Sequence, residues 1–346
     1  MRRLFMVVVV TGLFGSAFGQ TANAATIADL ARTMGADRER VLYDGAKKEG
    51  KIVWYTSLVP NKEIAKVFES KYPGVTVETY RSSGMAVATR VLAETQSKRY
   101  LVDDVETTPG ALMLLRDNKL LAPFASPHLA EYPEIAKEKA QGNLVYWASD
   151  RESYNGVGYN KNAIRSADVP KNFDDLLKPA LKGRLGIVSE ESGARMIGAM
   201  LRVRGDGFVR KLREQNIVLH GMTAIGLNSL VVTGEVPITF TSVNTNIAQA
   251  ADKGAPVAWV PMDLVPANAG GAAVYLYSQH PHAALLFSDF LFSPAGQKLL
   301  AERFEYGSAR RDYGFKRWYP EQGLSTYDYV ERSEKWQKLI ADITRK

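Results

Sequence analysis

Hydrophobic and polar positions in the first half of the chain switch repeatedly between the period of a strand and that of a helix. Short runs rich in β-branched and aromatic residues predict strands, and the longer stretches after them repeat their apolar residues with helical spacing. The predicted strands are 51–55, 75–80 and 104–107, and the predicted helices are 61–71, 84–98 and 109–118. Strands that alternate with helices across short connections predict parallel α/β units.

The same alternation resumes in the second half, after a polar and loosely helical segment at 127–143. Two short strands are predicted within 144–159, on either side of Asp150-Arg151-Glu152. Further strands are predicted at 184–188, 236–240 and 257–261, and further helices at 173–177, 192–204, 245–252, 281–303 and 327–344.

This pattern predicts an α/β protein made of two lobes. A chain of this length is more than one hydrophobic core ordinarily holds, and no internal repeat is visible. The chain is expected to cross between the lobes near 154–159 and near 259–264, which gives two hinge strands. Lobe 1 is predicted to combine 25–155 with 262–346, and lobe 2 to span 156–261.

The chain begins with the pattern of a cleaved export signal. Arg2 and Arg3 precede a mostly apolar run at 4–18, and Ala22-Asn23-Ala24 supplies a small-x-small cleavage site. The apolar run is shorter than the roughly 20 residues that span a bilayer as a helix. We therefore predict a signal peptide at 1–24 and a mature chain that begins at Ala25, with an uncleaved membrane anchor as the alternative.

The absence of cysteine from the sequence and its modest charge narrow the location and the partners. Without cysteine there is no disulfide, no thiolate site and no lipid attachment after the cleavage site. Together with the export signal this favours the periplasm. Removing Arg2 and Arg3 from the 44 basic residues leaves 42 against 37 acidic ones, a net charge of +5. The basic pairs lack interleaved aromatic residues, so no nucleic-acid partner is expected.

Small hydroxyl residues and glycines gather where predicted strands end and helices begin. In open α/β sheets ligands bind beyond the carboxyl ends of the strands, where helix amides and the helix dipole favour an anion. The alternative is that each hydroxyl merely caps a helix. The residues at these turns are Thr56, Ser57, Ser82, Ser83, Gly84, Thr107, Thr108, Ser189, Ser192, Gly193, Ala194, Thr241, Ser242 and Asn244.

Motifs for catalysis are missing from the sequence. It has no G-x-S-x-G elbow, no H-E-x-x-H and no phosphate-binding loop. His280 and His282 flank Pro281 and would either bind a metal or be exposed. Glu190 and Glu191 would either act together as acid and base or belong to a solvated loop. Exposure and the solvated loop are the readings we favour, and no enzyme activity is predicted.

Aromatic residues are more numerous than a ligand cleft requires, and most are expected in the core. Tyr55, Tyr80 and Tyr154 lie near strand ends or a crossing, and one of the three is expected to line a ligand site.

Three motifs resemble the type II periplasmic solute-binding proteins of ABC importers, in the branch that contains the ferric-ion-binding proteins. The segment 283–297 is similar to the late helix of that family, with its serine and Gly-Gln ending. Ser192-Gly193-Ala194 resembles the turn with which the branch holds an oxyanion, and 234–237 resembles the segment before the ligand strand. The resemblance spans 45–315 and implies a two-lobe binding protein that closes on its solute.

The metal ligands of that branch are replaced in this sequence. Asn244 and Thr245 occupy the positions of the iron-binding tyrosine pair, Asn61 that of the histidine, and Thr107 or Thr108 that of the glutamate. Ferric iron prefers anionic oxygen donors, for which neutral amides and hydroxyls are poor substitutes. The anion turn is kept while the metal ligands are absent, which favours an anionic organic solute bound directly.

The predicted function is therefore a periplasmic, monomeric component of an ABC importer that captures a small carboxylate, phosphate ester or phosphonate and presents it to an inner-membrane permease. No cofactor and no metal site are expected. Alternatives are a ferric-iron-binding transport protein, a secreted hydrolase or lyase on the same lobes, and a receptor for a chemotaxis sensor. The predicted ligand-binding residues are Tyr55, Ser57, Ser83, Gly84, Thr107, Thr108, Ser192, Gly193, Ala194, Ser242 and Asn244.

Overall fold

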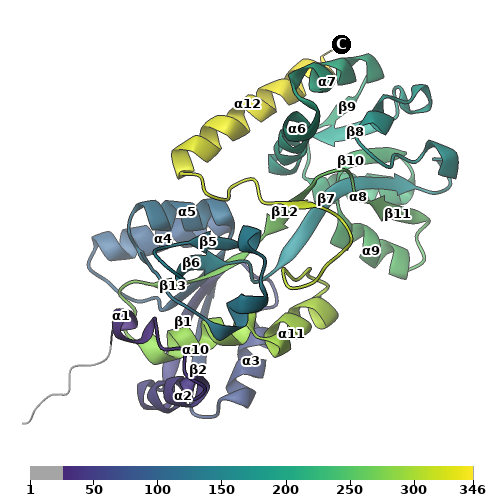
Figure 1. Cartoon of the computed structure of the whole chain (residues 1–346). Coiled ribbons are helices and arrows are strands. Elements are labelled where there is room, and N and C mark those ends of the chain that lie inside the picture. Colours follow the sequence, from purple (N-terminus) through teal and green to yellow (C-terminus); the bar gives the residue numbers. More distant parts are fainter. Residues whose placement is uncertain (1–25, 346) are drawn as a thin grey trace, which may run out of the picture.

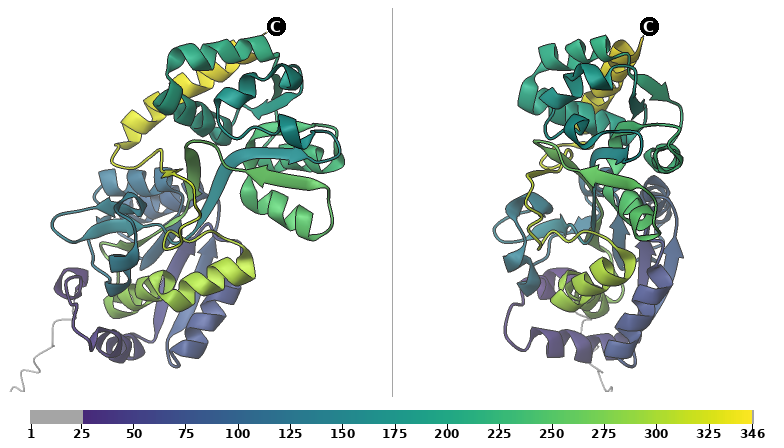
Figure 2. Two further views of the ribbon diagram at one scale, coloured as in Figure 1. Left: turned by 45° about the vertical axis from the view of Figure 1, so that its right-hand side comes forward. Right: turned by 90° about the vertical axis from the view of Figure 1, so that its right-hand side faces the viewer.

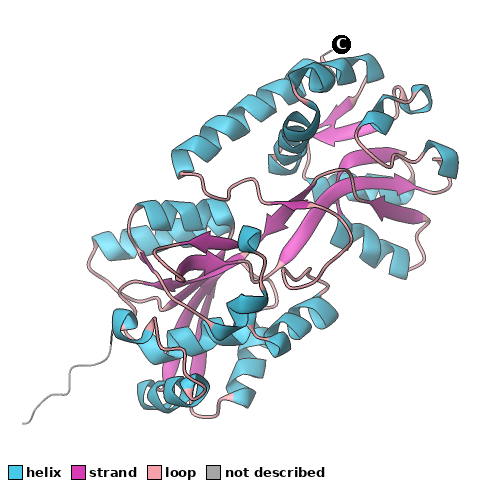
Figure 3. Ribbon diagram, viewed as in Figure 1, coloured by secondary structure: helices cyan, strands magenta, loops and turns pink. Residues whose placement is uncertain are grey.

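The computed structural model describes residues 26–345, in two lobes that each contain one sheet (Figure 1). Helices flank the strands of both sheets, as the α/β prediction requires (Figure 3). The predicted signal peptide at 1–24 lies outside the described residues. Within 26–345 no helix is both long enough and apolar enough to cross a membrane.

The sheet of the first lobe has the strand order β2-β1-β3-β13-β6-β5, and β4 pairs with β13. Its strands are β1 (Lys51–Thr56), β2 (Thr76–Arg81), β3 (Asp104–Thr107), β4 (Leu121–Ala122), β5 (Lys137–Lys139), β6 (Val145–Ala148) and β13 (Gly271–Tyr275). Strand β1 runs parallel to β2 and β3, whereas β13 returns antiparallel to β3. The helices of this lobe are α1 (Ile27–Leu30), α2 (Arg38–Glu49), α3 (Asn61–Lys71), α4 (Gly84–Gln96), α5 (Pro109–Asp117), α10 (Pro281–Phe292) and α11 (Pro294–Phe304), with 3-10 turns η1 (Pro127–Glu131) and η2 (Glu134–Ala136).

The sheet of the second lobe has the order β14-β12-β7-β10-β8-β9, and β11 pairs with β7. Its strands are β7 (Glu152–Asn160), β8 (Leu185–Val188), β9 (Val218–His220), β10 (Ile238–Val243), β11 (Val257–Val260), β12 (Val265–Ala269) and β14 (Arg317–Trp318). Its helices are α6 (Glu191–Arg204), α7 (Asp206–Lys211), α8 (Ala224–Thr233), α9 (Asn244–Asp252) and α12 (Thr326–Thr344), with 3-10 turns η3 (Ser166–Asp168), η4 (Asp174–Leu177), η5 (Pro179–Leu181) and η6 (Leu212–Gln215).

The strands are held in place by apolar side chains on both faces of each sheet. In the first lobe Trp54 of β1 is fully buried against Phe287 of α10, with ring centroids 4.9 Å apart. In the second lobe all four residues of β8 are buried, as expected for a strand with neighbours on both sides. Burial of such side chains contributes roughly 1.5–3 kcal/mol each, which fixes the register of the sheets.

Strand β7 joins the two lobes, because it begins at Glu152, which bridges Gly307 just beyond α11 of the first lobe, and continues into the sheet of the second lobe. Its first residues pair with β12, where Tyr154 stands opposite Ala267. Its last residues pair with β10 and β11. The chain returns to the first lobe between β12 and β13, a few residues beyond the crossing predicted near 259–264.

A third crossing leads from α11 of the first lobe through β14 to the C-terminal helix. The boundaries predicted from the sequence assigned 262–346 to lobe 1, but the structure packs α12 against α6 and α7 of the second lobe (Figure 2). Trp336 and Ile340 of α12 are buried in the second lobe, where the side chain of Trp336 lies over Gly198. The apolar stripe of α12 packs on a face formed by α6 and α7. Those helices lie far from α12 in the sequence, so no local pattern predicted this contact.

The single helix predicted at 281–303 is two helices. Pro294 lacks an amide hydrogen and restricts the residue before it to extended backbone, and Ser293 accordingly has φ −64° and ψ 158°. Ser293 then caps α11 by accepting a hydrogen bond from the amide of Gly296 at 3.1 Å. The apolar periodicity continues through this boundary, but serine followed by proline marks the end of one helix and the start of the next.

Candidate functional site

A cavity of about 460 Å³ lies between the two lobes. The first lobe and the hinge supply Arg151, Ser153, Asn268, Phe304 and Tyr306. The second lobe supplies the residues at the beginnings of three helices, which are Glu190, Glu191, Ser192, Arg195, Thr223, Ala224, Ile225, Val243, Thr245, Asn246 and Gln249. These helices follow strands or loops at one edge of the sheet, so their N-termini converge.

Two of the three helix beginnings lack a side-chain cap. Neither Glu190, which precedes α6, nor Val243, which precedes α9, donates or accepts a capping bond there. The first-turn amides of these helices therefore have no partner within the helix and carry the positive end of the helix dipole. Helix α8 is capped by Thr223, and its first amide, of Ala224, donates to the Glu190 carboxylate at 2.6 Å.

Arg151 brings a positive charge to the cavity from the first lobe. Its Nε donates to Oε1 of Glu106 at 3.1 Å, and its terminal nitrogen donates to Oγ of Ser57 at 3.1 Å. Burial lowers the pKa of Arg151, but the carboxylates of Glu106 and Asp150 more than offset this, so the pKa lies above its ordinary value. The guanidinium stays charged and lies 5.4 Å from the ring centroid of Tyr306.

Arg195 brings a second guanidinium from α6, and it also contacts the hinge. It donates to the carbonyl of Ala267 at 3.2 Å and to Oδ1 of Asn268 at 3.1 Å, both on β12. Its other terminal nitrogen donates to Glu191 at 2.8 Å and to Glu321, which lies in the third crossing. The Nε of Arg195 is buried without a partner among the described residues. One buried side chain thus joins the cavity, the second lobe and the hinge.

The family of the chain follows from comparison with known proteins. Residues 59–304 match the sequence profile of the bacterial extracellular solute-binding proteins. The chain belongs to this family. A search among curated proteins found no match.

Solved structures share the fold at low sequence identity. Iron-bound HitA from Pseudomonas aeruginosa is 22% identical, with a TM-score of 0.64 over 85% of this chain and 99% of that one. AfuA from Actinobacillus pleuropneumoniae, solved with fructose-6-phosphate bound, is 20% identical, with a TM-score of 0.60 over 85% and 97% of the chains. The ferric binding protein from Campylobacter jejuni is 18% identical, with a TM-score of 0.63 over 84% and 99%. The predicted family and the two-lobe fold of type II periplasmic binding proteins are confirmed.

The structure places the three residues of the predicted anion turn in different surroundings. Ser192 lines the cavity in the first turn of α6. Gly193 and Ala194 are buried, and a β-carbon on Gly193 would clash with the carbonyl oxygen of Val188. Glycine at 193 is therefore required for packing the helix against its own strand, and it does not line the cavity.

The predicted residues after β10 bind the protein itself. Ser242 is fully buried and donates to Oδ1 of Asn228 at 2.7 Å. Asn244 accepts a hydrogen bond from the amide of Tyr154 at 2.7 Å, which links α9 to the hinge strand. Neither residue lines the cavity, but their neighbours Thr245 and Asn246 do.

The predicted residues of the first lobe form one group at the ends of β1, β2 and β3. Thr107 donates to the carbonyl of Gly84 at 3.1 Å, and a β-carbon on Gly84 would lie 2.6 Å from Oγ1 of Thr108. Ser83 is exposed before α4, and Ser57 reaches the cavity only through its bond with Arg151. None of these predicted first-lobe residues lines the cavity between the lobes.

The three candidate tyrosines lie away from the cavity lining. Tyr55 is buried under α4, where it donates to Glu94 at 2.9 Å, and burial followed by that carboxylate raises its pKa to about 12. Tyr80 packs on Tyr55 with ring centroids 5.0 Å apart. Tyr154 is buried in the hinge with its hydroxyl on Glu152.

Most residues of the cavity lining were not predicted from the sequence, among them Arg151, Arg195, Phe304 and Tyr306. Arg195 follows Ser192 by three positions, which places both on one face of a helix, and this spacing could have identified it. The other three come from a hinge segment and a helix end whose position relative to the second lobe no local pattern reveals.

Two of the four histidines, His280 and His282, each lie against a carboxylate. His280 Nδ1 lies 2.8 Å from Asp103, and His282 Nδ1 lies 2.7 Å from Glu49. Within residues 26–345 no cluster of three or more histidine, aspartate or glutamate side chains is arranged to hold a metal ion.

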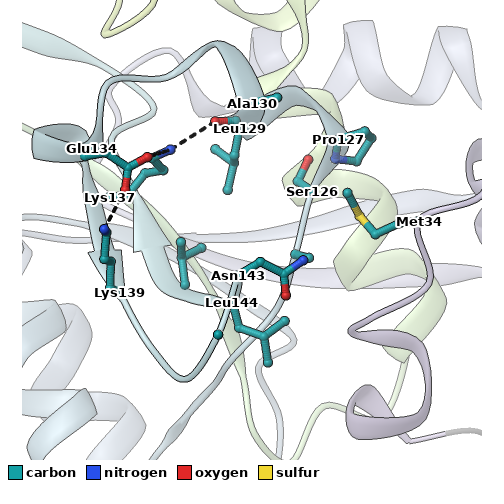
Figure 4. Close-up of a pocket in the computed structure, with 13 residues that line it drawn as sticks. Met34, Ser126, Pro127, Leu129, Ala130, Glu134, Lys137, Lys139, Asn143 and Leu144 are labelled. Atoms are coloured by element: carbon teal, nitrogen blue, oxygen red, sulfur yellow. Dashed lines mark hydrogen bonds and ion pairs between the residues drawn. The ribbon is translucent and has the colours of Figure 1, made fainter.

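Another cavity, of about 390 Å³, is confined to the first lobe (Figure 4). Glu134 lies between Lys137 and Lys139 there, and both lysines form ion pairs with it. Both lysines thus already have a carboxylate partner, and none of the described helices of eight or more residues begins at the lining of this cavity. The cavity between the lobes is the better candidate for the solute site.

Proposed function

We propose that this solute-binding protein captures a small organic anion, a carboxylate, phosphate ester or phosphonate, between its lobes in the periplasm. It then presents the anion to an inner-membrane ABC permease as a monomer. The observation that carries the proposal is the meeting of two uncapped helix beginnings with Arg151 and Arg195 in one cavity. A hydrogen bond to a charged group contributes about 1.5–3 kcal/mol, so a few of them account for strong capture.

Closure of the lobes would complete the site. Arg151, Phe304 and Tyr306 belong to the first lobe or its edge, and Ser192 and Thr245 belong to the second. A solute that contacts both groups stabilises the closed arrangement, because those contacts exist together only there. The predicted first-lobe residues Ser83, Gly84, Thr107 and Thr108 would then approach the ligand.

Ferric iron, the alternative suggested by the fold of HitA, finds less support in the side chains. Tyr306 is the only tyrosine in the lining of the cavity among residues 26–345, and burial raises its pKa. Glu106, next to the position of the family's glutamate, already accepts bonds from Thr56 and Arg151. An iron site would have to break these contacts to obtain anionic oxygen donors.

The proposal is tested by calorimetric titration of the mature protein with methylphosphonate, phenylphosphonate, acetate, benzoate, fructose 6-phosphate and ferric citrate. We expect at least one metal-free anion to bind without turnover, and ferric citrate to leave the protein colourless. Replacing Ser192 with alanine should weaken binding about 10- to 150-fold. The matched control is Ser189→Ala, at an exposed serine outside the cavity lining. A coloured iron complex, or equal affinity of Ser192→Ala and wild type, would refute the proposal.

A further inference from the structure

We infer that the solute carries an apolar, ring-like body beside its anionic group, and that Phe304 and Tyr306 contact this body from one side and Ile225 from the other. The inference rests on the proposed function, because it concerns the part of the same solute that the charged groups do not bind.

The two aromatic side chains are displayed by an unusual turn. Helix α11 ends at Phe304, and Glu305 follows with φ 60° and ψ 20°, in the left-handed region where glycine is the ordinary residue. The amide of Tyr306 then donates to the carbonyl of Leu300 at 3.1 Å and closes the turn. Backbone strain of this kind is common at functional sites. The turn places both rings at the cavity, each only partly buried.

An apolar side chain comes from the other lobe. Ile225 is the second residue of α8 and lines the cavity with 58% of its surface exposed. Ala224 and Val243 extend the apolar lining on that side. The cavity therefore has apolar surface from both lobes, which a bound molecule could cover on two sides.

Polar groups near this apolar lining are already bonded within the protein. Thr223 accepts from the amide of Gly226 at 3.1 Å, Ser153 donates to the carbonyl of Asn268 at 3.3 Å, and Asn268 accepts from Arg195. Glu190 and Glu191 are likewise engaged. A polyhydroxylated solute would have to compete for these partners, whereas a ring would not.

The polar groups without a protein partner stand at the two uncapped helix beginnings. Among the described residues, the side chains of Ser192, Thr245 and Gln249 make no hydrogen bond, and Oδ1 of Asn246 is buried without a partner. The hydroxyls of Ser192 and Thr245 and the side-chain amide nitrogen of Gln249 can donate to the anionic end, whereas the Asn246 oxygen can only accept a hydrogen bond and would face a donor on the solute. Arg151 lies between the two regions, because it faces the ring of Tyr306 at 5.4 Å. One part of the cavity thus offers unbonded polar groups and another part offers apolar surface. This arrangement matches a solute that has an anionic group at one end and an aromatic ring at the other.

The experiment compares anions that share a head group and differ in their body. Phenylphosphonate is titrated against methylphosphonate, benzoate against acetate, and fructose 6-phosphate serves as the hydroxylated anion. Burial of a ring is expected to make the aromatic member of the pair that binds about 10- to 100-fold tighter than its aliphatic member. Fructose 6-phosphate should bind more weakly than the aromatic anion.

Variants assign the difference to the proposed side chains. Phe304→Ala and Ile225→Ser should each weaken the aromatic anion about 10-fold and barely change the aliphatic one, while Tyr306→Phe keeps the ring and the affinity. Val330→Ser is the matched control, since Val330 is 49% exposed on α12 and outside the cavity. The unliganded melting temperature of each variant shows that it folds.

The outcomes separate the two proposals. If no anion binds, the proposed function fails and the inference fails with it. If acetate, methylphosphonate or fructose 6-phosphate binds as tightly as the aromatic anion, the solute is anionic but the apolar body is refuted. Equal weakening of every anion by Phe304→Ala would likewise show that the ring supports the fold of the site and does not contact the solute body.

Discussion

Replacing Arg195 with methionine tests whether the ion cluster beside the hinge holds the third crossing to the second lobe. The side chains of Arg195 and Glu321 are only 2% and 3% exposed, so neither charge is solvated by water. Removing the cation leaves the Glu321 carboxylate buried without its partner. The loss from breaking a buried pair in this way is about 3–5 kcal/mol. For a chain of this size we expect the melting temperature to fall by roughly 6–10 °C.

The loss of stability in Arg195→Met should depend on pH. Burial raises the pKa of Glu321 above its ordinary value, and Arg195 only partly opposes this. Without Arg195 the pKa rises further, and a carboxyl whose folded pKa exceeds its unfolded pKa stabilises the fold at low pH and loses that contribution as the pH rises. The variant should therefore be closer to wild type at pH 5 than at pH 8.

Urea denaturation of the unliganded protein at the two pH values measures both effects. The control is the double variant Arg195→Met with Glu321→Gln, which removes the unpaired charge and should recover more than half of the lost stability. Equal stability of Arg195→Met and wild type at pH 8, or no recovery in the double variant, would show that the cluster does not stabilise the third crossing.

Three further predictions follow from other parts of the molecule. The hydrogen bond with Asp103 raises the pKa of His280, so the contact between them should stabilise the fold below pH 6.5 and lose this contribution as the pH rises through the raised pKa. Urea denaturation of His280→Gln should therefore show a larger loss of stability at pH 5.5 than at pH 9. Gly193→Asp should lose the folded state, seen as a missing thermal transition, because its side chain meets the Val188 carbonyl; a normal transition would contradict the packing. Intact mass of protein recovered from the periplasm should correspond to a chain that begins at Ala25, and retained Met1 would disprove the cleavage site.

Local patterns predicted the elements that have a clear period. The strand predicted at 51–55 is β1 (Lys51–Thr56), and the helix predicted at 61–71 is α3 with the same bounds. Helix α8 was not predicted, because its sequence is apolar around most of its circumference and ends in β-branched residues. Strands β12 and β13, rich in alanine and glycine, also lack the usual strand composition.

Helix beginnings on the second lobe could be predicted as a ligand site from the sequence, because a strand followed by a hydroxyl residue and a helix is a local pattern. Ser192 was found in this way, and its amide environment follows from helix geometry alone. The residues that oppose it could not be found. Arg151 and Tyr306 are separated from Ser192 by long stretches of chain. The bridge between Glu152 and Gly307 brings Arg151 and Tyr306 together, and the hydrogen bonds of Arg195 to β12 hold helix α6 beside them.

The sequence by itself therefore determined the α/β class, the two lobes, the family and the beginning of helix α6 at the cavity, since each depends on residue type and short-range spacing. Tertiary structure alone decided that α12 packs on the second lobe, that Gly193 serves packing, and that Phe304 and Ile225 face one cavity. The physical reason is that burial and hydrogen bonding act between surfaces in space. Which apolar stripe meets which partner, and which polar atom remains unbonded, depends on contacts between residues far apart in the chain.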